Sequence, residues 1–205
     1  MRSRKRVAKE KKVINIKYDT NYSLTSLIIM FFVFGFIGWV WEVALFGIKE
    51  HLFVNRGTLY GPILPIYGFG GVLFLFLTRY KPFKEIIKRP ILMFITIIII
   101  CTIMEYVTSF YLQARTGFRY WTYEKHPLNL NGRICFDASV GFGIVGMFAL
   151  YVLGPALEKI IAKINIKIKI AICTVLILIL VADFGYAQFR PHIGDGISRE
   201  IEHIE

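Results

Sequence analysis

Residues Leu24–Ile48 read LTSLIIMFFVFGFIGWVWEVALFGI, an apolar run whose only charged residue is Glu42. An α-helix rises ~1.5 Å per residue, so about 20 apolar residues cross the ~30 Å hydrocarbon core of a bilayer. Inside lipid, every backbone amide must find its partner within its own element. This stretch therefore predicts a helix that crosses a membrane.

Four more apolar runs follow the first, and together they fill most of the 205 residues. The chain is 56% hydrophobic and 19% charged, whereas a soluble domain has about 45–50% apolar and about 25% charged residues. We predict an all-α fold, a polytopic membrane helix bundle of about five transmembrane helices with no soluble domain. The further spans are Leu59–Thr78, Ile91–Ala114, Ile134–Leu157 and Ile168–Ala187.

Lys and Arg residues are shared unevenly between the two sides of these spans. The side that includes the N-terminus carries 17 of the 25, and the other side carries eight. Cytoplasmic loops are enriched in Lys and Arg, so we expect the N-terminus inside and the C-terminus outside, in a multi-pass protein of the cell membrane. The chain then divides into a basic cytoplasmic segment (1–23), a five-helix transmembrane domain (24–187) and a polar C-terminal tail (188–205).

The net charge of +11 would suggest nucleic-acid binding in a soluble protein. Here eight of the basic residues precede the first span, so we assign them to topology and lipid contact and expect no nucleic-acid partner. The three cysteines and four histidines lack metal-binding spacing, so we expect no metal and no cofactor. The GxGxxG pattern of Gly141–Gly146 lies inside a predicted span, where glycines suit helix packing rather than dinucleotide binding.

Two acids, Glu42 and Glu105, fall in the outer half of their predicted spans. Gly35 and Gly38 share a helix face with Glu42 and would let a neighbouring helix approach closely. Around Glu105, polar residues three and four positions away form a polar stripe on an Ile-rich helix. A carboxylate at a helix centre costs about 2.5–3.5 kcal/mol, so both acids should face the interior of the bundle.

An arginine follows each acid-bearing helix in the next outer turn, within Asn55-Arg56-Gly57 and Asn131-Gly132-Arg133. A buried acid needs a partner, so we pair Glu42 with Arg56 and Glu105 with Arg133. These residues predict a polar pocket on the outer side of the membrane. Its expected members are Glu42, Asn55, Arg56, Tyr67, Glu105, Tyr106, Ser109, Asn131, Arg133 and Asp137.

Several features of this outer side keep a simpler interpretation. Asp137 and Asp183 can equally lie in the headgroup region, capped by water. The prolines and glycines of Leu59–Thr78 indicate either a mere kink or a broken backbone, and the latter survives at membrane depth only against protein or water. The aromatic loop around Tyr120 and Tyr123 is first an interfacial belt, and less readily a lid over the pocket.

Four motifs indicate a family: Gly38-Trp39-x-x-Glu42, Asn55-Arg56-Gly57 with the following Tyr67-Gly68, Glu105-Tyr106-x-Thr108-Ser109, and Asn131-Gly132-Arg133-Ile134. With them the chain, from about Phe34 to Pro155, resembles the bacterial family catalogued as type IV ABC-transporter permeases. That resemblance implies a multi-pass permease partnered by a separate ATPase. Trp121-Thr122-Tyr123 stands where the family tends to show Trp-Asp-Tyr, which puts a role for an acid there in doubt.

Three functions fit these observations. The first is a transport subunit whose outer pocket binds a solute. The second is an enzyme that acts on a lipid or lipid-linked substrate, with Glu42 or Glu105 as general base and the arginines holding a phosphate, and we rank it lower; no catalytic residue is assigned. The third is an assembly subunit whose charges pair internally. The expected partners are the lipid bilayer and, as candidates, an ATPase subunit and a second copy of the chain.

Overall fold

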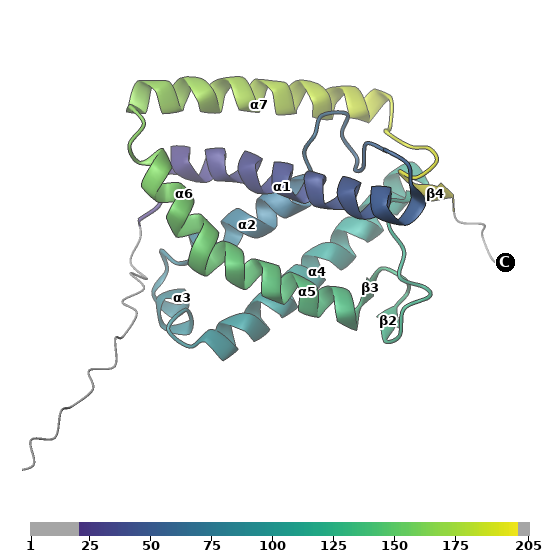
Figure 1. Cartoon of the computed structure of the whole chain (residues 1–205), viewed down its shortest axis with the longest axis horizontal. Coiled ribbons are helices and arrows are strands. Elements are labelled where there is room, and N and C mark those ends of the chain that lie inside the picture. The colour runs from purple at the N-terminus through teal and green to yellow at the C-terminus, as the bar shows by residue number, and fades with distance from the viewer. Residues whose placement is uncertain (1–20, 201–205) are drawn as a thin grey trace, which may run out of the picture.

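The computed structural model describes residues 21–200, which are mainly helical (Figure 1). The predicted cytoplasmic segment therefore lies almost wholly outside the described residues, as do residues 201–205. Four two-residue strands lie in the loops: β1 (Phe118–Arg119), β2 (Asn129–Leu130), β3 (Ile134–Cys135) and β4 (Arg199–Glu200). The helices are α1 (Leu24–Glu50), α2 (Pro65–Leu77), α3 (Lys81–Ile86), α4 (Pro90–Thr116), α5 (Phe136–Phe148), the π-helix η1 (Ala149–Leu153), α6 (Gly154–Ile161) and α7 (Ile166–Phe189).

Four helical stretches of the described chain are long and apolar enough to cross a membrane: α1, α4, the continuous α5–η1–α6 run and α7. Their outer faces carry large apolar side chains, such as Ile103 on α4 and Leu178 on α7, both exposed. An apolar surface of this extent suits lipid and not water. The prediction of an all-α membrane helix bundle is confirmed.

The second predicted span, Leu59–Thr78, is wrong in its helical extent. Only Pro65–Leu77 is helical, and its 13 residues reach about 20 Å at ~1.5 Å per residue. Residues 59–64 are not helical, and the amide of Leu64 donates instead to the carbonyl of Gly35, near the middle of α1, at 3.0 Å. Pro65 begins α2 because its missing N–H costs nothing at the first position of a helix.

Glycines set how closely α1 and α2 pack. A Cβ added at Gly35 would collide with Ile63, and one added at Gly68 would collide with Phe31. Small residues let two helix backbones approach where lipid supplies no hydrophobic driving force between them. On the other side of the bundle, Gly143 of α5 packs against Phe94 of α4 in the same way, as the helix-packing interpretation of the GxGxxG pattern predicts.

Helix α7 forms an outer layer that runs alongside α1 (Figure 1). Its Asp183 accepts hydrogen bonds from the amides of Tyr60 and Gly61, at 3.0 and 2.8 Å. Those amides belong to the non-helical segment and have no helical carbonyl to bind. Asp183 therefore stabilises the non-helical segment by accepting these two hydrogen bonds. The interpretation of Asp183 as a residue of the headgroup region did not predict this role.

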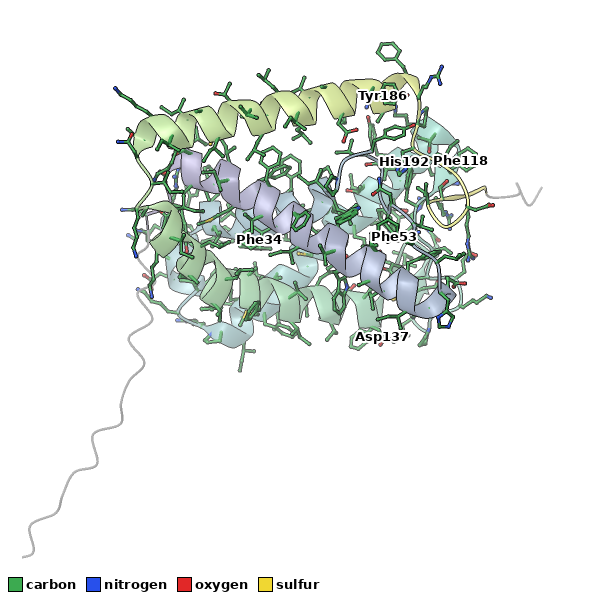
Figure 2. All side chains as sticks on the ribbon, turned by 45° about the horizontal axis from the view of Figure 1, so that its top comes forward. Phe34, Phe53, Phe118, Asp137, Tyr186 and His192 are labelled. Atoms are coloured by element: carbon green, nitrogen blue, oxygen red, sulfur yellow. The ribbon has the colours of Figure 1, made fainter. Side chains whose placement is uncertain are left out.

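The end of the bundle that holds the long loops is called the loop end here, and the opposite end, with α3 and the α6–α7 junction, the basic end. At the loop end, β4 pairs with β1 and β2 pairs with β3, both antiparallel. The described part of the predicted polar tail therefore lies against the loop after α4. Figure 2 shows Phe118, Tyr186 and His192 gathered at this end, and the His192 ring hydrogen-bonds the Gly57 carbonyl at 2.9 Å.

Candidate functional site

Glu42 meets a tyrosine of α2 inside the bundle. Gly38, one turn earlier on α1, leaves room for the ring of Tyr67, which a Cβ at this position would strike. The Tyr67 hydroxyl then donates to Glu42 Oε1 at 2.7 Å. The expectation that the glycine face of α1 turns Glu42 towards a neighbouring helix agrees with this geometry.

Arg56 lies next to Glu42 and contacts three parts of the loop end. Its Nη2 is 3.9 Å from Glu42 Oε2, and the same nitrogen donates to the Tyr120 carbonyl at 3.3 Å. Its Nη1 donates to the carbonyl of Gly196 in the C-terminal segment. The Arg56 side chain is 16% exposed and that of Glu42 is 32% exposed, so this ion pair is only partly shielded from its surroundings.

Glu105 of α4 is 3% exposed and has one hydrogen-bond partner. The hydroxyl of Tyr123, from the loop after α4, donates to Glu105 Oε1 at 2.8 Å. Glu105 Oε2 is buried and has no hydrogen-bond partner among residues 21–200. The Glu42 carboxylate lies within electrostatic range of Glu105, so two acids from different helices repel each other here.

We call Glu42, Arg56, Tyr67, Glu105 and Tyr123 the carboxylate cluster. Its members come from α1, the 51–64 segment, α2, α4 and the 117–133 loop, which meet at the loop end. Burial raises the pKa of the Tyr123 hydroxyl far above its ordinary value, and the Glu105 carboxylate raises it further. Burial also lowers the pKa of Arg56, while the Glu42 carboxylate acts in the opposite direction. Tyr123 is therefore a hydrogen-bond donor at every physiological pH.

The predicted pairing of Glu105 with Arg133 is wrong. Arg133 donates to Ser109 Oγ at 3.1 Å and to Gln113 Oε1 at 2.5 Å, one and two turns along α4 from Glu105. Its guanidinium also lies 5.4 Å from the centre of the Phe110 ring. Arg133 thus binds neutral partners, and the carboxylate cluster has one arginine for two acids.

The other predicted residues lie around the cluster or apart from it. Asn55 accepts from Trp39 at 2.6 Å and donates to the Tyr60 carbonyl, so it fixes the loop after α1. Asn131 donates to the Tyr106 hydroxyl at 3.0 Å, which ties the tip of the second loop to α4. Asp137 is exposed in the first turn of α5 and lies at the edge of the molecule (Figure 2).

Sequence analysis did not include Tyr123 or Gln113 among the site residues. The aromatic loop around Tyr123 was the one signal for this residue, and sequence analysis favoured an interfacial belt over a lid that folds back. Gln113 continues the polar stripe of α4 four residues beyond Ser109 and could have been found from that spacing. Among residues 21–200, no group of His, Cys, Asp and Glu side chains could hold a metal ion.

Residues 29–187 match the model of the family described as "Putative ABC-transporter type IV". The chain belongs to this family. The match covers the four long helices, α2 and the whole carboxylate cluster, so these are parts of the family's common region. A search of curated proteins found no match. A search of solved structures likewise found none.

Proposed function

We propose that this member of the ABC-transporter-related family is the permease-like membrane subunit of a transport system. We propose further that a solute binds at the carboxylate cluster. The observation that carries the proposal is Glu105 Oε2, a buried carboxylate oxygen with no hydrogen-bond partner among residues 21–200, at the meeting point of α1, α2, α4 and the 117–133 loop. An unmet acceptor of this kind costs about 1–3 kcal/mol, and more when it is charged. A bound solute would remove that cost.

Charge indicates the class of solute. With both acids ionised, Arg56 neutralises one carboxylate of the cluster, and Arg133 is turned towards Ser109 and Gln113. The remaining negative charge favours an organic cation, such as an amine. The enzyme alternative gains less support, because both arginines already bind protein groups and are not free to hold a phosphate.

The transport proposal also assigns an orientation and a partner. The loop end would face the outside of the cell membrane, as the distribution of Lys and Arg predicts. A separate ATPase subunit would then bind at the basic end, where the short helix α3 lies between α2 and α4 in the described chain. Its basic residues, Lys81 and Lys84, suit an acidic partner surface.

A solute screen tests the cluster. Wild-type protein in nanodiscs is heated with a panel of amines, amino acids and metal cations, alongside Glu105→Gln and Asp137→Asn. A solute present at 100 times its Kd should stabilise the wild-type protein by about 2.7 kcal/mol, seen as a rise in Tm. Glu105→Gln should lose that rise, whereas Asp137→Asn, which removes an exposed acid outside the cluster, should keep it.

A solute that raises the Tm of wild type and of Glu105→Gln equally would refute binding at the cluster. The transporter assignment has its own test, which does not depend on the solute. Purification in mild detergent from the native cell should yield the chain together with a subunit that hydrolyses ATP. Recovery of the chain without any ATP-hydrolysing subunit would contradict it.

A further inference from the structure

Helix α7 is held against the rest of the bundle at its two ends. At the basic end, Cys173 Sγ donates to the Thr25 carbonyl at 3.4 Å. At the loop end, Asp183 binds the backbone of residues 60 and 61, and Ala187 is buried. Between Cys173 and Asp183 no residue of α7 is buried. The middle of the helix therefore contacts the bundle only partly, through side chains such as Leu180.

An apolar groove of about 500 Å³ occupies the space that this leaves. Its walls come from the first part of α1, from α2 and from α7, with Met104 of α4 also lining it, and every lining side chain is apolar. Leu24 and Phe76 line its end nearest the basic end, and Leu180 and Phe69 line the other end. The volume is within the range of ~300–1,000 Å³ that ligand sites occupy. Water in such a groove is unfavourable, so its occupant should be apolar.

A cation sits at the mouth of this groove. The Arg79 guanidinium lies 5.3 Å from the centre of the Phe76 ring, whose side chain lines the groove. Arg79 Nη2 also donates to the carbonyl of Tyr22, two residues before Leu24. Arg79 is otherwise exposed, so its remaining N–H groups can bind a further acceptor.

A second cation lies on the groove-facing stripe of α7. Lys169, Cys173 and Ile177 follow one another at four-residue spacing and so share a face. Lys169 is 8% exposed because its stem is covered, whereas its ammonium forms no ion pair within residues 21–200 and reaches the surface. An ammonium that reaches the surface at the end of a membrane helix can bind an anion of the membrane interface.

Within residues 21–200, the acid of α6, Glu158, forms no ion pair with Arg79 or Lys169. Glu158 accepts a hydrogen bond from Ser26 at 3.2 Å. Ser26 is two residues from Leu24 and two from Ile28, which both line the groove, so at 100° per residue it faces the opposite side of α1. Arg79 and Lys169 thus both lie near the first turn of α1: Arg79 binds the Tyr22 carbonyl, and Lys169 is one turn before Cys173, which binds the Thr25 carbonyl.

We propose that an anionic phospholipid occupies this place. One acyl chain lies in the groove between α1, α2 and α7, and the headgroup phosphate binds Arg79 and Lys169. The lipid belongs to the leaflet at the basic end. Phosphate is the anion that a membrane supplies at this depth next to an acyl chain, so a single ligand meets both the apolar wall and the unpaired charge. This site does not depend on the carboxylate cluster at the loop end.

Native mass spectrometry of the full chain in detergent tests the proposal. The protein is offered phosphatidylglycerol or phosphatidylcholine with identical acyl chains, and bound lipids are counted. Wild type should retain phosphatidylglycerol preferentially. Arg79→Gln and Lys169→Gln should each reduce that retention about fivefold, since one cation near the membrane surface is worth about a factor of this size. Lys163→Gln, an exposed lysine at the same end, should reduce it little.

A second pair of variants keeps the test valid if Lys169→Gln fails to fold. Ile177→Trp should fill the groove and lower retention of both lipids, whereas Ile179→Trp, on the exposed side of α7, should leave it unchanged. Equal retention of the two lipids by wild type would overturn the proposal, as would equal lipid binding by the two tryptophan variants. A dimer that forms only without lipid would show that a second copy covers the groove, and would overturn it too.

Discussion

At the scale of single residues, Gly38 makes room for the tyrosine that hydrogen-bonds the Glu42 carboxylate. Tyr67 can lie against α1 only because position 38 has no Cβ, and its hydroxyl then reaches Glu42. Tyr123 reaches Glu105 across the loop in a corresponding way. In both pairs a phenol from a neighbouring segment satisfies a carboxylate that its own helix cannot satisfy.

Gly38→Ala should therefore destabilise the protein, because the new Cβ would strike the Tyr67 ring and separate α1 from α2. Overpacking of this kind costs about 1–3 kcal/mol. Gly141→Ala is the matched control, since a Cβ there meets nothing within 4 Å. Thermal unfolding in detergent should show a lower Tm for the first variant and an equal or higher Tm for the second. A Tm unchanged by Gly38→Ala would argue against the close α1–α2 contact.

Tyr123→Phe removes the hydrogen bond that Glu105 receives and leaves both of its carboxylate oxygens unpartnered. We expect a loss of about 1–3 kcal/mol of stability. Tyr111→Phe, an exposed tyrosine on the same α4 helix, should have little effect. The comparison is a thermal melt of the two variants under one detergent condition. If both variants have the Tm of the wild-type protein, the Tyr123 hydroxyl does not stabilise Glu105.

At the scale of elements, hydropathy predicts which segments are helices better than where each one begins. The spans of α1, α4 and α7 follow from apolar length alone, because a bilayer leaves a long apolar segment few other structures. The start of α2 did not follow, because proline and glycine patterns indicate a break without saying on which side of Pro65 the helix resumes. The acceptor for that broken backbone, Asp183, lies 123 positions from Tyr60 and no local pattern connects them.

Asp183→Ala should destabilise this broken segment in particular. Two amides at membrane depth would lose their acceptor, at about 1–3 kcal/mol each, and α7 would lose its attachment at the loop end. Asp195→Ala, an exposed acid in the C-terminal segment, is the control. Hydrogen exchange should rise at residues 60 and 61 in the first variant and stay unchanged in the second. Unchanged exchange in both would show that Asp183 does not hold the segment.

At the scale of the whole molecule, the loop end concentrates the long-range polar contacts and α7 covers one side of the bundle. The pairing of Glu42 with Arg56 was predictable, because Arg56 follows α1 closely in the chain and a buried acid needs a partner. The pairing of Glu105 with Arg133 failed on the same reasoning, because Ser109 and Gln113 provide nearer acceptors on α4. Closeness in the sequence suggests which acids and arginines could pair, and the packing of the helices and loops determines which pairs form.

The central claim is that the 117–133 loop folds back so that Tyr123 reaches Glu105 inside the bundle. Replacing Tyr123 with the photoreactive residue p-benzoylphenylalanine tests it directly, with Phe110, an exposed position on α4, as the control site. After irradiation in lipid, position 123 should cross-link to the α4 peptide that contains Glu105 or to the α1 peptide that contains Glu42, while position 110 should label lipid. Lipid adducts at position 123, or cross-links confined to its own loop, would contradict the account.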